Sequence, residues 1–395
     1  MKRFLILVIF ACAILVLYNA CSKTNNPIST TQKIIVLYNG LLIDGTGSQP
    51  IQNAIIVIED KHIKYVGTES NYEKPNNAKI IDVSSYTILP GLINTHVHSG
   101  YTEANLKEWA KSGVTTVRDL GSFTQSPTTA FSNRNELLKE NINAHLVAAG
   151  PLVTTIGGYG NYEVSSQNDA RQKTIGLINA GADIIKIAIE DDLQGRRWSM
   201  LSMDEIKMIV QTAHEKNILV SAHISRAKHL EMAVKADVDD VAHMIVDELP
   251  DSLITSMIKK DIYWVPTLEL WKGVSQIHSL DWDIKAINNL NRFVNAGGKV
   301  ALGTDYDGYV CEFDLGMPIH EIKLMLEAGM IPMEIIVAGT KQAAHVCDLE
   351  NELGTIEEGK IANILVIKDN PLENIDAFTD VYMVIHNGSI IRESN

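Results

Sequence analysis

Between residues 87 and 302, short apolar runs alternate with longer amphipathic stretches. The stretch 203–216 shows the helical pattern most clearly, because apolar residues recur every three or four positions and Ser202 is a suitable cap for its start. The apolar runs fit the buried strands of a parallel sheet. These runs lie at 87–95, 114–117, 144–148, 183–189, 218–222, 238–242, 262–265 and 300–302.

Eight strand candidates separated by helical stretches predict an α/β protein with a TIM (β/α)8 barrel, which we place at 89–354. A doubly wound sheet is the alternative architecture. It is less favoured because no glycine-rich phosphate-binding loop opens this region of the chain.

Both ends of the chain show a different pattern, in which short β runs are separated by Gly, Asn and Asp. Asn387 and Gly388 lie between two such runs and are typical of a tight hairpin turn. Because the two ends are alike, the sequence predicts one small β-sandwich domain built from 33–88 and 355–395.

The first residues follow the pattern of an export signal, in which basic residues precede an apolar run that here ends at Tyr18. We expect 1–21 to be a lipoprotein-type signal peptide with Cys21 lipidated, and the polar stretch 22–32 to be a tether. The protein would then be exported and lipid-anchored to a membrane, the outer membrane facing the periplasm if the source is Gram-negative. An uncleaved anchor and a plain signal peptide are the alternatives, since Tyr18 replaces the more usual leucine.

Composition narrows the choice of partners. The net charge is −14 and no basic stripe is present, so we expect no nucleic acid and no membrane contact beyond the lipid anchor. A small-molecule substrate is expected, and the sequence leaves a homo-oligomer open. Outside the signal region only Cys311 and Cys347 remain, and either a disulfide or two free thiols fits this pair.

Charged and metal-binding side chains close several of the expected strands. In a TIM barrel such side chains meet at one rim, where the active site lies. His96 and His98 are two positions apart, so a strand points both the same way, and imidazole is a good ligand for divalent transition metals. The residues expected at this rim are His96, His98, Lys186, His223, His243 and Asp305.

Lys186 lies inside an apolar run, where an amine is costly unless it is paired. One interpretation is a buried ion pair. The interpretation we favour, because of the neighbouring histidines, is an amine made less basic by burial that reacts with carbon dioxide. The resulting carbamate would bridge two metal ions as a carboxylate does.

The other histidines are interpreted as ordinary surface or packing residues, because they fall in expected helices, loops or the β domain, or on the wrong side of a strand for the rim. They are His62, His145, His214, His229, His278, His320, His345 and His386.

Six segments together resemble the metal-dependent amidohydrolase superfamily, in particular its branch of imidazolonepropionase-like proteins and Xaa-Pro dipeptidases. The resemblance implies a metal-bearing β/α barrel with a β-sandwich from both termini, in agreement with the hydrophobic pattern. The segments are 41–47, 89–98, 113–119, 182–187, 303–305 and 354–363.

The resemblance also implies a ligand set. The implied ligands are His96, His98 and Asp305 for one ion, His223 and His243 for the other, and carboxylated Lys186 as a bridge between them. The ions would be zinc, or else manganese, cobalt or iron, and would share a hydroxide that attacks the substrate. Asp305 would also be the general base and pass the proton to the leaving amine. The implied reaction is hydrolysis of an amide or peptide-like C–N bond in a dipeptide or an N-acyl amino acid.

Several positions depart from the superfamily pattern or stay open. Asn94 and Asn363 stand where relatives often have aspartate. Tyr159 stands where relatives often have histidine, so we expect it to face the substrate and either donate to the oxyanion or line the pocket. Arg118 follows the second strand, where it would either bind a substrate carboxylate or pair with Asp119 or another acid.

Two other kinds of function remain as alternatives. A lactonase, an organophosphate hydrolase or a deaminase would use the same metal site, although Lys186 counts against the deaminases, which usually need one metal ion. A binding lipoprotein without turnover is the alternative outside the enzymes. The complete set of expected ligands argues against it.

Overall fold

The computed structural model describes residues 33–68, 72, 75, 77–121 and 126–394. The expected signal peptide, Cys21 and the tether lie outside the described residues. Within the described part of the chain, no helix is long and apolar enough to cross a membrane. Cys311 and Cys347 are both free thiols, so of the two alternatives for this pair the structure shows the unbonded one.

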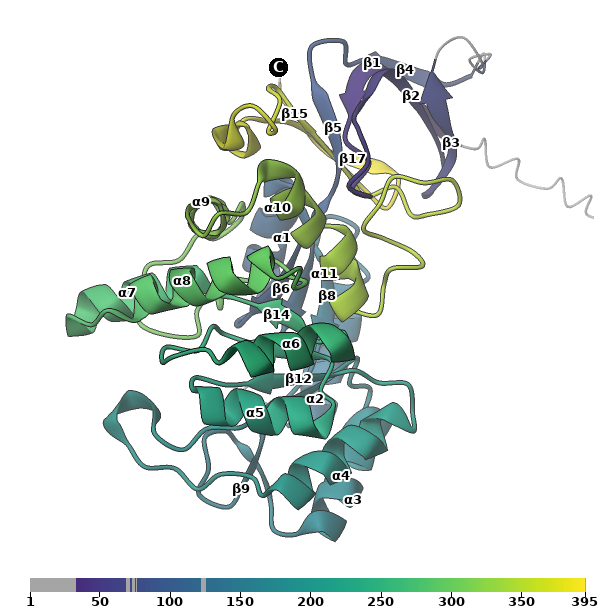
Figure 1. Ribbon diagram of the computed structural model, residues 1–395. Helices are drawn as coiled ribbons and strands as arrows, with labels where there is room; N and C mark the ends of the chain where they lie inside the picture. The colour runs from purple at the N-terminus through teal and green to yellow at the C-terminus, as the bar shows by residue number, and fades with distance from the viewer. Residues whose placement is uncertain (1–32, 69–71, 73–74, 76, 122–125, 395) are drawn as a thin grey trace, which may run out of the picture. The chain divides into compact units, whose positions relative to one another are not determined.

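Both ends of the chain contribute to one eight-stranded sheet, in the order β17-β16-β15-β5-β1-β2-β3, with β4 paired to β1 (Figure 1). Strand β5 joins the two ends, because it runs parallel to β1 on one side and antiparallel to β15 on the other. The strands are β1 (Ile34–Leu42), β2 (Ile51–Glu59), β3 (His62–Thr68), β4 (Lys79–Asp82), β5 (Thr87–Pro90), β15 (Ile364–Ile367), β16 (Val381–His386) and β17 (Ser389–Glu393).

Successive side chains point to opposite faces of this sheet, and apolar residues are buried on both faces. Ile35 and Leu37 belong to one apolar cluster, whereas Val36 between them belongs to another. The expected turn connects β16 to β17, and both of its residues have positive φ, 47° at Asn387 and 69° at Gly388. The structure shows one hydrogen-bonded sheet, and the two facing layers that define a sandwich remain a prediction.

The middle of the chain forms two parallel sheets, ordered β6-β7-β8 and β10-β9-β11-β12-β13-β14. The strands of the first sheet are β6 (Leu92–Val97), β7 (Val114–Asp119) and β8 (His145–Ala148). Those of the second are β9 (Val153–Thr155), β10 (Tyr162–Val164), β11 (Ile185–Ala188), β12 (Val220–His223), β13 (Asp240–Ala242) and β14 (Tyr263–Val265).

Backbone hydrogen bonds link these two sheets on both sides. On one side, the N–H of Asp183 donates to Ala148 O at 3.0 Å. On the other, the segment 300–305 lies between β14 and β6, because Ala301 N donates to Trp264 O (2.9 Å) and Thr95 N donates to Leu302 O (2.8 Å). This segment was expected as the eighth strand but makes only an isolated bridge between Val300 and Trp264.

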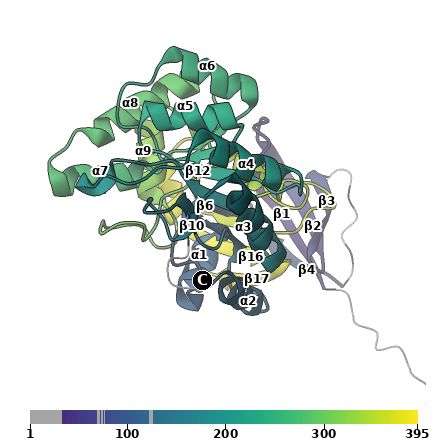
Figure 2. The ribbon, with the colours of Figure 1, turned by 90° about the horizontal axis from the view of Figure 1, so that it is seen from below.

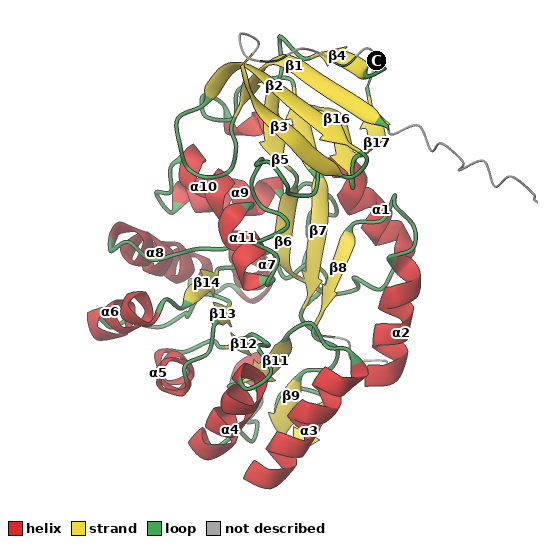
Figure 3. Ribbon diagram, turned by 90° about the vertical axis from the view of Figure 1, so that its right-hand side faces the viewer, coloured by secondary structure: helices red, strands yellow, loops and turns green. Residues whose placement is uncertain are grey.

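The helices lie around the outside of the parallel strands (Figures 2 and 3). The expected helix at 203–216 is α4, which begins with a capping box between Ser202 and Glu205 and buries the predicted apolar face. The helices are α1 (Glu103–Ser112), α2 (Pro127–Leu137), α3 (Gln167–Ala180), α4 (Met203–His214), α5 (Ala227–Ala236), α6 (Asp251–Lys260), α7 (Leu268–His278), α8 (Trp282–Asn295), α9 (Ile319–Glu327), α10 (Pro332–Ala338) and α11 (Lys341–Val346).

Candidate active site

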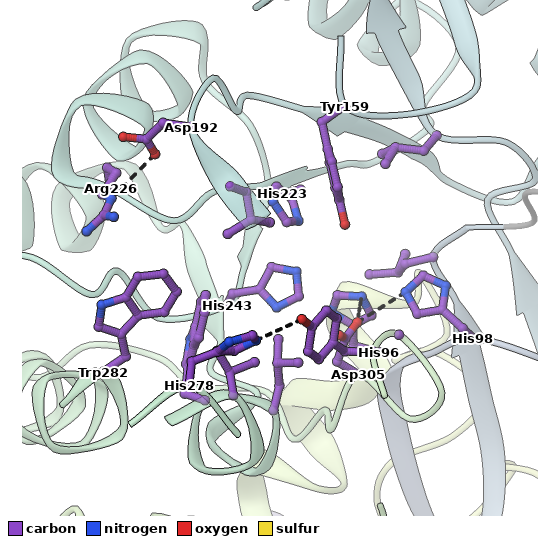
Figure 4. A pocket seen from close by; sticks show the side chains of 18 of the residues that line it. His96, His98, Tyr159, Asp192, His223, Arg226, His243, His278, Trp282 and Asp305 are labelled. Atoms are coloured by element: carbon purple, nitrogen blue, oxygen red, sulfur yellow. Dashed lines mark hydrogen bonds and ion pairs between the residues drawn. The ribbon is translucent and has the colours of Figure 1, made fainter. Parts of the chain in front are cut away.

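One cavity of about 520 Å³ collects the residues that close the parallel strands (Figure 4). His96 lies in β6 and Lys186 in β11, His223 ends β12, and His243 directly follows β13. Asp305 ends the segment that links β14 to β6. The expected site residues that line the cavity are His96, His98, Lys186, His223, His243, Asp305 and Tyr159.

His96, His98 and Asp305 form a compact group whose candidate ligand atoms all lie within 4.8 Å of one another. Asp305 Oδ1 lies 3.0 Å from His96 Nε2 and 3.1 Å from His98 Nε2. His98 Nδ1 lies 3.0 Å from Gly121 O, and a proton there leaves a lone pair on Nε2 facing the carboxylate. Two electron-rich atoms face each other in this arrangement, so it requires either a proton or a metal ion between them. The donor set therefore fits a divalent cation.

Without a metal ion, a proton must lie between the imidazole nitrogen and the carboxylate oxygen. Burial would lower the pKa of His98, but its hydrogen bond with Asp305 and the charge of that carboxylate outweigh burial and raise the pKa to about 9. Burial lowers the pKa of His96 and of His243 well below the ordinary histidine value. Neutral imidazole is the form that binds metals.

His243 and His223 continue the group, with ring centroids 4.8 Å apart for His96 and His243 and 4.6 Å apart for His223 and His243. His243 Nδ1 lies 2.9 Å from Thr267 Oγ1, which leaves Nε2 as its candidate donor atom. The backbone places His243 and Asp305 in the left-handed region, at φ 73° and 64°. Such conformations cost on the order of 1 kcal/mol or more each, and they turn both side chains into the cavity.

Lys186 is 2% exposed, and its Nζ lies 3.5 Å from Ser221 Oγ. Burial lowers its pKa to about 7, although the carboxylate of Asp240 acts in the opposite direction. A substantial fraction of this amine is therefore neutral and nucleophilic near neutral pH.

Tyr159 lies on the loop after β9 and extends toward the histidines (Figure 4). Its ring centroid is 4.8 Å from that of His223 and 5.6 Å from that of Trp198. Burial and the nearby charges of Asp305 and Glu190 raise the pKa of its hydroxyl, so the hydroxyl keeps its proton. The position agrees with a residue that faces the substrate, and both roles expected for Tyr159 remain open.

Arg118 does not reach this cavity, so its expected role as a substrate ligand is corrected. Its side chain is fully buried and fully engaged inside the fold. It donates to both oxygens of Asp240 (2.7 and 3.0 Å), to Thr95 O (2.6 Å) and to Val346 O (2.7 Å). The structure shows the alternative, pairing with an acid, and the acid is Asp240 rather than Asp119.

Comparison with known proteins shows the family of this chain. The sequence model of the amidohydrolase family matches residues 87–391, which is most of the chain. The chain belongs to the amidohydrolase family. This confirms the resemblance found in the sequence and the expectation of a hydrolase that acts on carbon–nitrogen bonds.

The proteins similar to this chain match it over most of its length. An ochratoxinase from Aspergillus niger is 26% identical over 90% of this chain and 85% of its own. An imidazolonepropionase from a Geobacillus species is 24% identical over 81% of this chain and 85% of its own. The crystal structure of a Xaa-Pro dipeptidase with bound methionine has a TM-score of 0.81 at 24% identity, over 92% of this chain and 100% of that one. The likeness to this structure confirms the amidohydrolase fold.

Glu190 is a residue of this amidohydrolase site that the sequence interpretation missed. It follows β11, is 1% exposed, and places Oε2 3.5 Å from His223 Nε2. Ser225 Oγ donates to the same oxygen at 2.5 Å, and the N–H groups of Asp191 and Asp192 donate to Oε1 at 2.9 Å each. Burial would raise the pKa of Glu190, but the contact with His223 and these donors lower it to about 2. A carboxylate held beside His223 leaves Nδ1 of that ring as the candidate metal donor.

Two of the histidines interpreted as surface or packing residues lie close to the site. His229 is completely buried at the start of α5, with Nε2 2.9 Å from Asp191 Oδ1. His278 lines the cavity of the amidohydrolase at the end of α7, and its Nε2 lies 3.0 Å from the Tyr309 hydroxyl. Neither lies at a strand end, so the rule that found the metal-binding candidates has no means of finding them.

Proposed function

We propose that this amidohydrolase cleaves an amide or peptide-like C–N bond, in a dipeptide or an N-acyl amino acid, at a centre of two divalent metal ions. The observation that carries the proposal is the convergence of four histidines, Lys186 and Asp305 in one cavity. Each comes from a parallel strand, from a residue that directly follows one, or from the segment 300–305. The names of the similar proteins, a dipeptidase and an ochratoxinase among them, support the same choice.

The residues divide between two ions, which are zinc in our proposal, with manganese, cobalt or iron as substitutes. His96, His98 and Asp305 would hold the first, and His223 and His243 the second. When bound, the ions would lower the pKa of a water molecule toward neutrality and polarise the scissile carbonyl. Asp305 takes up the proton released during attack and delivers it to the leaving amine, whose departure otherwise has a high barrier.

Lys186 completes the centre as a carbamate. Its neutral amine forms a bond to the carbon of carbon dioxide and loses one proton to solvent, so that Nζ carries a carboxylate. The lowered pKa supports this step, because only the neutral amine has a lone pair to donate. The negative charge so created offsets part of the charge of two divalent ions.

We also retain the finer organisation expected from the sequence. The hydrogen bonds that link the two parallel sheets on both sides support one closed (β/α)8 barrel at 89–354. A β-sandwich at 33–88 and 355–395, a lipidated Cys21 after a signal peptide at 1–21, a tether at 22–32 and export to an outer membrane are parts of the same proposal. Mass spectrometry of the mature N-terminus tests the lipidation.

The direct test is a screen of zinc-loaded protein against dipeptides and N-acyl amino acids, followed by lactones and phosphotriesters. We expect amide hydrolysis, loss of activity on chelation, and recovery when zinc is restored. The Asp305→Asn variant should be inactive, whereas Asp307→Asn, a carboxylate of the same loop that does not line the cavity, should not. Turnover of lactones or phosphotriesters alone, or release of ammonia alone, would replace the proposal by one of its alternatives.

Lys186→Ala tests the carbamate. We expect this variant to bind one metal ion in place of two, by metal analysis, and to lose at least about 100-fold in kcat. Acetate or propionate should restore part of the activity by occupying the place of the carbamate. Lys207→Ala, on the exposed side of α4, is the matched control. Two bound ions and full activity in Lys186→Ala would rule the carbamate out.

A further inference from the structure

The end of the cavity away from His98 and Asp305 has a different character (Figure 4). Trp271 and Trp282 meet edge to face there, with centroids 5.5 Å apart, and Trp271 in turn lies 6.1 Å from the ring of His243. These aromatic side chains form a wall that begins at a metal-binding residue. Leu270, Val274 and Leu280 also line the cavity.

Arg226 lies at the far end of this wall. Its guanidinium carbon is 5.2 Å from the ring centroid of Trp282, an arrangement in which the ring stabilises the cation. Arg226 precedes α5 on the loop after β12, only three positions beyond His223. A cation is therefore held over an aromatic face at this end of the cavity, where Asp192 and His278 are also part of the lining.

The hydrogen-bonding capacity of Arg226 is largely unused. Its one ionic contact joins Nε to Asp192 Oδ1 at 3.6 Å, which is too long for a good hydrogen bond. Both side chains are about a quarter exposed, at 25% and 29%, so this pair adds little stability. Among the described residues, the two terminal nitrogens of Arg226 have no hydrogen-bond partner. Two parallel N–H groups of this kind are the geometry that binds a carboxylate at both of its oxygens.

The position of Arg226 sets the length of the ligand. Two tryptophan rings lie between His243 and Arg226, in steps of 6.1, 5.5 and 5.2 Å. Figure 4 shows Arg226 and Asp305 on opposite sides of the cavity. The α-carboxylate of a dipeptide or an N-acyl amino acid is separated from the scissile carbonyl by only two atoms. A carboxylate at the end of a longer arm therefore fits Arg226 better than this α-carboxylate does.

We propose that the substrate carries a carboxylate remote from its scissile amide, bound by Arg226, with an apolar or aromatic spacer packed against Trp271 and Trp282. The inference rests on the proposed amide hydrolysis and names the class of amide. Arg226 determines specificity, and Asp192 competes with the substrate carboxylate for the same cation.

The test uses N-succinyl-, N-adipoyl- and N-suberoyl-phenylalanine, each compared with the neutral carboxamide of its terminal acid. We expect kcat/KM to favour the acid over the carboxamide by about 10- to 100-fold for the suberoyl compound, and much less for the short succinyl one. The difference should appear in KM rather than kcat, because Arg226 does not touch the reacting atoms.

Two variants locate the effect. Arg226→Met should raise KM for the suberoyl acid by about 10- to 100-fold and leave the carboxamide unchanged. Asp192→Asn should lower KM for the acid several-fold, because it removes the competing charge. Arg292→Met, which removes an arginine of α8 that pairs with exposed Asp251, is the matched control.

The outcomes separate this inference from the proposed function. Hydrolysis of amides without preference for a remote carboxylate, or an Arg226→Met variant with unchanged KM, overturns the inference alone. A preference for a terminal amine that disappears in Asp192→Asn also overturns it, by assigning this end of the cavity to a cation. No hydrolysis of any amide by the zinc-loaded protein overturns the proposed function itself.

Discussion

The two ends of the cavity are built from different parts of the fold. At the histidine end, side chains come from strands or from the residues that directly follow them, and hydrogen bonds fix His98 and His243 from behind. At the far end, Trp271 and Trp282 come from helices and Arg226 from a loop, with one long ionic contact. The contrast teaches that the scaffold fixes the reacting groups, whereas the connections after the strands leave the recognition groups free to engage a ligand.

The two arginines show the same contrast within one residue type. Arg118 is enclosed among β7, β13 and the end of α11 and has every nitrogen hydrogen-bonded, whereas Arg226 keeps its terminal nitrogens for a ligand. An arginine with satisfied donors serves the fold. An arginine with unsatisfied donors at a cavity serves binding.

Replacing each arginine by methionine should give the largest difference, which we expect in the free energy of unfolding. We expect Arg118→Met to lower the free energy of unfolding by about 3–5 kcal/mol, because it leaves the carboxylate of Asp240 buried without its partner. Arg226→Met should change it by less than about 0.5 kcal/mol. Urea unfolding followed by circular dichroism measures both. The double variant Arg118→Met/Asp240→Leu should recover much of the loss, and equal effects of the two single variants would contradict the distinction.

Glu190→Gln should sharpen the contrast at the histidine end. The variant keeps the shape of the side chain but removes the charge beside His223, so we expect metal affinity to fall by about 10- to 100-fold. Competition with a chelating dye measures this affinity directly and does not depend on turnover. Glu248→Gln, at an exposed position, is the control. Unchanged affinity in Glu190→Gln would show that the carboxylate does not position His223.

At the far end of the cavity we expect a smaller effect, which appears in how the free energy of unfolding depends on pH. Glu321 accepts the N–H groups of Leu268 and Glu269 at the start of α7, the helix that carries Trp271. Burial raises the pKa of Glu321 to about 8, although these N–H donors act against burial. The raised pKa favours folding while the acid is protonated, so stability is full below the ordinary glutamate pKa and declines as pH rises through about 8.

Glu321→Gln isolates this effect. The amide cannot ionise, so we expect the decline in stability between the ordinary glutamate pKa and about pH 8 to flatten by at least about 1 kcal/mol, since one pKa unit corresponds to about 1.4 kcal/mol. Thermal unfolding across the pH range measures the change. A decline that is equally steep in the variant would assign the effect to another group. The control is Glu327→Gln, at the exposed end of α9, the helix that also carries Glu321.

The histidine end of the cavity could be predicted from the sequence because the prediction rests on the geometry of parallel strands. Residues that close parallel strands meet at one edge, so His96, His223 and His243 could be brought together without knowledge of any loop. Arg118 obeyed the same local pattern, yet its side chain points among the strands, toward Asp240. Direction depends on which face of a strand a residue occupies, and an apolar run buried on both faces gives no indication of it.

The far end could not be predicted because its signals are those of an ordinary core. Trp271 lies on an amphipathic helix with apolar neighbours, and only the packing of α7 against α8 makes it part of a cavity wall. Arg226 carried a weak signal, since it follows closely after His223. Glu190 carried a stronger one, as a carboxylate at the end of an apolar run, although a pattern of histidines alone does not include it.

The sheet shared by the two ends of the chain has a consequence for how the protein acquires its structure. Strand β5, at residues 87–90, receives its second partner from 364–367, so the sheet cannot be completed until almost the whole chain has left the ribosome. Contacts over such long sequence separations slow folding and leave a strand edge exposed in the meantime. Truncation shortly before Ile364 should therefore yield a nascent chain that depends on chaperones, although every residue proposed to bind metal or substrate has already been made.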